Sequence, residues 1–139
     1  MKSFHASITI NASQDTIWKI LTDAPHYPTW DPGVIRIEGT IAPGEKIVAY
    51  NKISPGRAFP VTVSEFVPGQ RMAWTGGMPF GLFTGVRTFT LVPKGRSTDF
   101  TLREEFIGPL LGLIERTIPD MTASFQDFVV GLKAQAEQA

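Results

Sequence analysis

The chain has 139 residues, of which 42% are hydrophobic and 19% are charged, a composition typical of a folded domain rather than of a disordered segment. Its 13 basic and 13 acidic residues cancel to a formal net charge of +0, so it lacks the positive surplus expected of a protein that binds nucleic acid. The absence of cysteine excludes disulfides, thiolate metal sites and a cysteine nucleophile.

The N-terminal segment lacks the apolar core of a signal peptide, and no apolar run approaches the roughly 18 residues of a membrane span. The two histidines leave little material for a zinc site. We therefore expect a single domain over residues 1–139, located in the cytoplasm as a monomer or homodimer, without a metal or another cofactor.

The first part of the chain predicts one strand and one short helix. Apolar and polar residues alternate over Phe4–Ile10, the pattern of a half-buried strand. Ser13 is a suitable N-cap for a helix over Gln14–Thr22. Three prolines within Pro25–Gly33 prevent a regular helix, so this stretch is either an irregular turn or a short second helix.

Turns in which glycine follows proline or lysine divide the middle of the chain into short, strand-like segments. Consecutive strands joined by such short turns favour an antiparallel meander. The predicted strands are Val34–Glu38, Glu45–Ile53, Ala58–Phe66, Gln70–Gly76, Thr84–Val92 and Thr98–Ile107.

The last stretch, Pro109–Ala139, predicts an amphipathic helix because its apolar residues recur at spacings of three and four. Pro119 should kink or break this helix, since proline removes a backbone donor. A helix with an apolar stripe and a sheet with one face to cover can bury each other, so we expect an α+β fold. The stripe consists of Leu110, Ile114, Ile118, Met121, Phe125, Phe128 and Leu132.

A series of short motifs runs along the chain in a defined order. They include Ser13-x-x-x-Ile17-Trp18-x-x-Leu21-x-Asp23, Tyr27-Pro28-x-Trp30-x-Pro32, Arg71-x-x-Trp74, Arg87-x-Phe89-x-Leu91-x-Pro93, Glu104-Glu105-Phe106-x-Gly108 and Phe128-x-x-Gly131-Leu132-Lys133. In these motifs, over essentially its whole length, the chain resembles the SRPBCC (START/Bet v 1-like) superfamily, in particular its polyketide cyclase/dehydrase-like group. The resemblance implies a helix-grip fold, in which a seven-stranded antiparallel curved sheet wraps around a long C-terminal helix and encloses a hydrophobic pocket. Members bind lipids, polyketides or other apolar molecules, and only some of them are enzymes.

Strand phase singles out Arg87 and Glu104. With Lys94-Gly95 in the hairpin loop, Arg87 faces Glu104 across neighbouring strands, on the same face as Phe89 and Leu102. In a pocket this pair could orient a ligand oxygen, and Glu104 could act as an acid or base. The alternative is a purely structural ion pair, since such pairs are common outside active sites. Glu65 is a weaker candidate, because a bulge near Pro68 could rotate it away.

Aromatic and aliphatic side chains on the same faces form the expected pocket wall, in which aromatic rings can stack on a flat ligand. Ordinary core packing is the competing interpretation for each of them. Besides Arg87 and Glu104, the residues expected to bind the ligand are Tyr27, Trp30, Val63, Met72, Trp74, Phe89, Leu91, Leu102, Ile118, Met121 and Phe125.

The glycine-rich segment Gly76–Phe83 carries large apolar residues whose exposure is costly unless they cover something. One interpretation is a lid over the pocket, with Ser54–Phe59 as a facing loop. A hairpin packed on the C-terminal helix and a dimer contact are equally good alternatives. The lid residues are Met78, Phe80, Leu82 and Phe83.

The remaining polar residues give weaker predictions. His26 is expected at the surface, because the sequence does not identify a carboxylate to orient it. Asp31 is expected to cap or turn the backbone rather than to react.

Three functions are consistent with these features. The first is binding of a small hydrophobic ligand of lipid, polyketide or aromatic type, as a carrier or sensor. The second is a cyclase/dehydratase-like enzyme that uses Arg87 and Glu104. The third is a co-chaperone-like module that contacts other proteins.

Overall fold

The computed structural model describes residues 1–139. Each predicted strand and the predicted first helix are present, with boundaries shifted by a few residues. In chain order the elements are β1 (Lys2–Ile10), α1 (Gln14–Leu21), the 3₁₀ helix η1 (Ala24–Thr29), β2 (Val34–Glu38), β3 (Lys46–Asn51), β4 (Ala58–Val67), β5 (Arg71–Gly77), the 3₁₀ helix η2 (Pro79–Gly81), β6 (Thr84–Lys94), β7 (Ser97–Ile107), α2 (Leu111–Ile114), the 3₁₀ helix η3 (Glu115–Thr117) and α3 (Thr122–Gln138).

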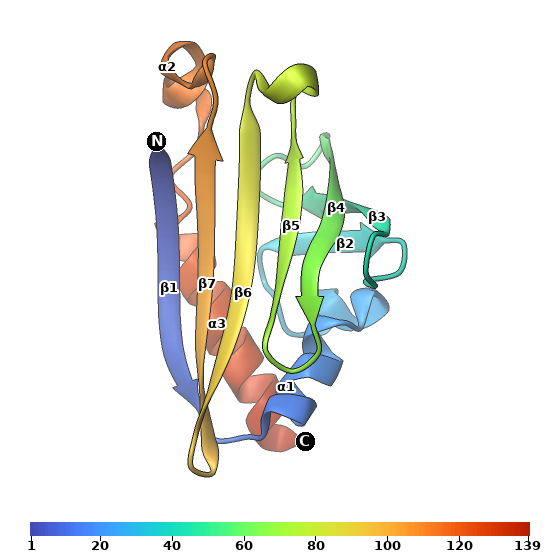
Figure 1. Cartoon of the computed structure of the whole chain (residues 1–139). Coiled ribbons are helices and arrows are strands. Elements are labelled where there is room, and N and C mark those ends of the chain that lie inside the picture. Colours follow the sequence, from blue (N-terminus) through green and yellow to red (C-terminus); the bar gives the residue numbers. More distant parts are fainter.

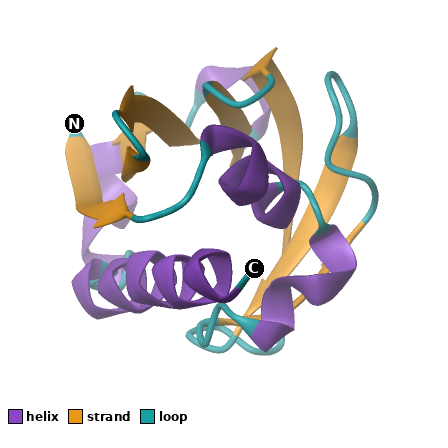
Figure 2. Ribbon diagram, turned by 90° about the horizontal axis from the view of Figure 1, so that it is seen from below, coloured by secondary structure: helices purple, strands orange, loops and turns teal.

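One antiparallel sheet contains all seven strands, in the order β1-β7-β6-β5-β4-β3-β2. From β2 to β7 each strand pairs with its neighbour in sequence, and β1 completes the sheet beside β7 (Figure 1). The strands curve and α3 lies along their concave side (Figure 2). This arrangement confirms the predicted curved sheet with a C-terminal helix.

Local sequence explains the helices after β1. The Ser13 hydroxyl accepts a hydrogen bond from the Thr16 N–H at 3.2 Å, which satisfies one free donor of the first turn of α1. The proline-rich stretch after α1 forms the 3₁₀ helix η1, so of the two predicted alternatives the short second helix is present. The Tyr27 hydroxyl donates to the Leu21 carbonyl at 2.6 Å and thereby fixes η1 against the end of α1.

The helical segment Pro109–Ala139 is broken near Pro119, as the sequence predicts, into α2, η3 and α3. Ile118 is extended (φ −76°, ψ 117°), because the ring of Pro119 disfavours a helical conformation in the preceding residue. The helix resumes at Thr122, whose N–H donates to the Asp120 carboxylate at 2.9 Å. The break divides the apolar stripe: Phe125, Phe128 and Leu132 are buried on α3, whereas Leu110, Ile114, Ile118 and Met121 are only half-buried.

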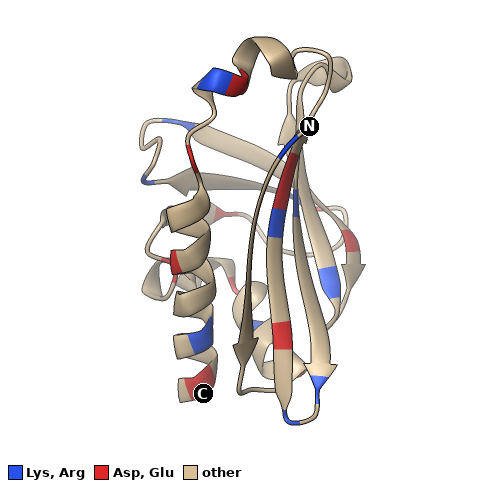
Figure 3. Ribbon diagram, turned by 90° about the vertical axis from the view of Figure 1, so that its left-hand side faces the viewer, with Lys and Arg blue, Asp and Glu red and all other residues tan.

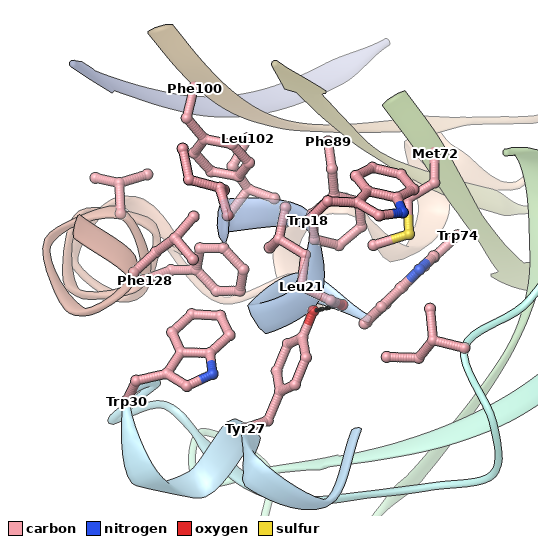
Figure 4. Packing of buried hydrophobic residues seen from close by; sticks show 14 of the residues in the cluster. Trp18, Leu21, Tyr27, Trp30, Met72, Trp74, Phe89, Phe100, Leu102 and Phe128 are labelled. Carbon is pink, nitrogen blue, oxygen red and sulfur yellow. Dashed lines mark hydrogen bonds between the residues drawn. The ribbon is translucent and has the colours of Figure 1, made fainter. Parts of the chain in front are cut away.

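The half of the fold that holds α1, η1 and α3 is densely packed with aromatic rings (Figure 4). The Tyr27 and Trp30 ring centroids lie 4.6 Å apart, and the Trp30 and Phe128 centroids 4.9 Å. Gly131 of α3 lies so close to η1 that a Cβ atom there would be 1.9 Å from the Trp30 carbonyl oxygen. Close approach of the backbones therefore requires glycine at this position.

Acidic and basic residues are interspersed along the chain, as β7 and α3 illustrate (Figure 3). On β7, Arg103 Nε lies 2.7 Å from Glu105 Oε1. None of the helices combines the length and the apolar character that a membrane crossing needs.

Candidate functional site

A cavity of about 380 Å³ lies between the concave face of the sheet and the chain that precedes α3. Strands β3 to β7 form its wall, and the segment from α2 to Met121 passes over it. Its lining includes the sheet residues Ala49, Asn51, Phe59, Val61, Trp74, Gly76, Gly85, Arg87, Glu104 and Phe106, the covering residues Ile114, Thr117, Ile118, Pro119 and Met121, and the loop residues Ile53, Ser54, Arg57, Met78 and Phe83.

Glycines replace large inward side chains where β5 and β6 line the cavity. In the core Met72 pairs with Phe89, and these side chains fill the space beneath α3. Four residues further along each strand, on the same face, Gly76 pairs with Gly85. A Cβ atom on Gly85 would lie 3.2 Å from the Phe106 ring, so that ring occupies the space that a side chain would need.

The break in the C-terminal helix contributes the opposite wall. Ile118, Pro119 and Met121, which surround the break, all line the cavity. The chain there is extended instead of helical, and it crosses the end of the sheet that α3 does not reach. Pro119 thus affects the site as well as the helix.

Arg87 and Glu104 are directly paired on β6 and β7 and both line the cavity, as strand phase predicts. Arg87 Nε donates to Glu104 Oε1 at 2.7 Å, and the two side chains are only 25% and 12% exposed. The guanidinium carbon lies 5.1 Å from the centroid of the Phe125 ring. Arg87 makes no other side-chain hydrogen bond, so donors of its guanidinium and Glu104 Oε2 are left for another partner.

Trp74 lies beside this pair. It is paired with Arg87 across β5 and β6, it lines the cavity, and it is 5% exposed. Its indole N–H is buried and has no acceptor within the protein. This nitrogen is closed off from the cavity, so Trp74 offers a ligand the apolar surface of its ring.

The predicted ligand-binding residues divide into two groups. Trp74, Ile118 and Met121 line the cavity together with Arg87 and Glu104. The others lie outside its lining and are buried in the core, so their contact with a ligand stays a prediction. These core residues are Tyr27, Trp30, Val63, Met72, Phe89, Leu91, Leu102 and Phe125.

The segment expected to act as a lid is the connection between β5 and β6. Met78 and Phe83 line the cavity, whereas Phe80 is 97% exposed and Leu82 lies at the surface. The Leu82 carbonyl accepts a hydrogen bond from the Leu110 N–H at 3.0 Å, which ties the connection to the chain before α2. Packing on the C-terminal segment is therefore present, while the lid and the dimer contact stay predictions.

Sequence reasoning overlooked Arg57 and the partner of His26. Arg57 lies in the predicted facing loop Ser54–Phe59 and lines the cavity. His26 Nδ1 lies 2.8 Å from Asp23 Oδ2, an i,i+3 pair that the spacing of the two residues could have indicated. This pair borders a separate cleft of about 190 Å³ that residues of α1, η1 and α3 line.

Two carboxylates expected to play minor roles are away from the cavity. Asp31 accepts a hydrogen bond from the Gly33 N–H at 3.1 Å, so it caps a turn as predicted. It is 8% exposed, and this burial raises the pKa of its carboxyl above the ordinary value. Glu65 occupies a bulge of β4 with φ +46°, and its side chain is exposed. No three His, Asp or Glu side chains are grouped to hold a metal ion.

Comparison with known proteins adds a family and a fold. The family described as "Polyketide cyclase / dehydrase and lipid transport" matches residues 1–137. No curated protein sequence matches the chain.

Among solved structures, protein MLL2253 from Mesorhizobium loti has a TM-score of 0.76 at 17% identity, and the match covers 99% of this chain and 98% of that one. A START superfamily protein from Mycobacterium smegmatis has a TM-score of 0.70 at 17% identity, with 98% and 97% covered. The di-domain ARO/CYC protein StfQ of the steffimycin biosynthetic pathway has a TM-score of 0.72 at 16% identity, with 98% of this chain and 50% of StfQ covered. At these identities the likeness concerns the fold.

Proposed function

Because the chain belongs to the polyketide cyclase/dehydrase and lipid transport family, we propose that it binds a small apolar molecule in the cavity beneath the Ile118–Met121 segment. The proposal rests on the cavity itself. Side chains fill the other half of the fold, which holds α1, η1 and α3. Its volume of about 380 Å³ lies in the range of roughly 300–1,000 Å³ usual for ligand pockets.

The lining has the composition that such a role needs. Phe59, Val61, Trp74 and Phe106 supply apolar surface, and burying apolar area contributes about 25 cal/mol per Å². The Arg87–Glu104 pair supplies polar groups at one place, which would fix the orientation of a ligand. A carrier or sensor needs nothing more than this combination.

A cyclase/dehydratase-like enzyme is the second candidate, and the Arg87–Glu104 pair is the observation that favours it. Arg87 could polarise a substrate carbonyl, and Glu104 Oε2 could take or return a proton. The apolar walls would hold the substrate in a folded conformation. On this hypothesis Glu104→Gln abolishes turnover but leaves the affinity for substrate within about tenfold, whereas a carrier has no turnover to lose.

Native mass spectrometry after gentle desalting tests the binding proposal. We expect an apolar species to remain bound to the purified protein and to identify the class of ligand. The variant Ala49→Phe, which fills the cavity, should lose this species, whereas Ala134→Phe on the exposed face of α3 should retain it. A protein that carries no bound species and also shows no saturable binding of an apolar fluorescent probe would contradict the proposal.

A further inference from the structure

The charged residues of the cavity indicate what kind of apolar molecule it accepts. Three charged side chains line it: Arg57, Arg87 and Glu104. Arg87 and Glu104 neutralise each other through their ion pair. Arg57 has no carboxylate within 4.0 Å, so the lining as a whole has one uncompensated positive charge.

Arg57 is located where an incoming ligand would meet it. It lies in the turn between β3 and β4, where its backbone N–H donates to the Ser54 carbonyl at 3.1 Å. Its guanidinium carbon lies 5.6 Å from the centroid of the Phe59 ring, another lining residue. Arg57 is exposed whereas Arg87 is half-buried, so Arg57 is at the mouth and Arg87 is deeper.

The two positions favour different chemical groups. An anion next to Arg87 would also be next to Glu104, and burying a third charge beside a neutral pair carries a desolvation cost. A neutral hydroxyl or carbonyl meets no such penalty there, because it can accept from Arg87 and a hydroxyl can also donate to Glu104 Oε2. At the mouth an anion can pair with the Arg57 guanidinium while the anion keeps part of its hydration.

We propose that the ligand is an amphipathic acid, whose apolar body occupies the cavity and whose anionic group pairs with Arg57 at the mouth. This inference rests on the proposed binding function and adds the class of ligand to it. Arg57 is then the residue that distinguishes an acid from the corresponding alcohol.

Competition experiments with matched ligands test this assignment. N-phenylnaphthylamine, a neutral probe that fluoresces in apolar surroundings, is bound to the protein and displaced by decanoic acid, decanol or decyltrimethylammonium. At about pH 7.5 the acid is ionised. We expect the acid to bind roughly three- to tenfold more tightly than the alcohol, the gain usual for a partly exposed charge pair, and the cation to bind most weakly.

Two variants test whether Arg57 causes the preference for the acid. Arg57→Gln should remove the preference for the acid, so that decanoic acid and decanol compete equally for the probe. Lys52→Gln removes the same charge from a neighbouring exposed position outside the lining, and it should keep the preference.

The possible outcomes separate the two proposals. If decanol competes as well as decanoic acid, or if the preference survives in Arg57→Gln, the assignment of an acidic ligand to Arg57 is wrong although the cavity binds apolar molecules. If the probe itself shows no saturable binding, the proposed binding function fails and this inference fails with it.

Discussion

Gly131 provides a sharp test of the packing that holds η1 against α3. Glycine inside a helix is usually unfavourable, and replacing it by alanine stabilises a helix by about 1 kcal/mol. Here a Cβ atom would lie 1.9 Å from the carbonyl oxygen of Trp30, far inside van der Waals contact. That oxygen belongs to the backbone, so α3 and the end of η1 would have to separate.

Helix propensity alone predicts that Gly131→Ala stabilises the protein, whereas this clash predicts that it destabilises the protein. Overpacking in a close-packed region costs about 1–3 kcal/mol, and here it occurs at a rigid backbone contact. We take the upper end of this range, about 3 kcal/mol, because the clash is with the backbone. After subtraction of the propensity gain of about 1 kcal/mol, we expect Gly131→Ala to lower the free energy of unfolding by about 2 kcal/mol and Tm by roughly 5–10 °C.

Gly112 in α2 is the matched control, because a Cβ atom at Gly112 would meet nothing within 4 Å. Gly112→Ala should leave the free energy of unfolding unchanged or raise it by up to about 1 kcal/mol. Urea and thermal unfolding followed by circular dichroism measure both variants. A Gly131→Ala protein as stable as the parent would refute the close approach of α3 and η1 on which the reasoning depends.

Other consequences can be measured with the same assays. Burial raises the pKa of Asp31, so the folded state prefers the protonated acid and loses stability as the pH rises from the ordinary value of 3.8 through the raised one. Asp31→Asn should accordingly be more stable than the parent near neutral pH and lose this advantage towards pH 3.8, and an advantage independent of pH would contradict the assignment. Removing one member of the Arg87–Glu104 pair should destabilise the protein by about 1–3 kcal/mol in denaturant titrations, because a half-buried charge is left without its partner. The double variant Arg87→Met/Glu104→Leu should recover most of that loss, and additive losses would argue against a coupled pair. Phe80→Ser should change stability by less than about 0.5 kcal/mol, because its side chain is 97% exposed, and a larger loss would mean that Phe80 packs against the fold.

The sheet and the ion pair are the parts of this protein that local sequence specifies. Alternation with a period of two and glycine-containing turns predict the strands, and the position of Lys94-Gly95 fixes the register that places Arg87 opposite Glu104. The Ser13 cap predicts α1 in the same way, and the prolines after it predict that no regular helix follows. In each case the physical cause of the element lies within a few residues of it, so it can be recognised in the sequence alone.

The location of the empty space depends instead on the tertiary structure. Tyr27, Met72 and Phe89 have the same apolar character as true lining residues, but they fill the core because η1 and α3 lie over them. Gly76 and Gly85 reveal an opening only when they are seen to pair across β5 and β6.

The sequence by itself determined that a curved sheet is built from β1 to β7 and that a proline interrupts the C-terminal segment. Only the tertiary structure decided that the helix breaks completely at Ile118–Met121, that the cavity lies beneath this break, and that Arg57 joins Arg87 and Glu104 in its lining. The physical reason is that strand periodicity is a local property of the backbone. A cavity is the difference between the volume that the backbone encloses and the volume that side chains from distant segments fill.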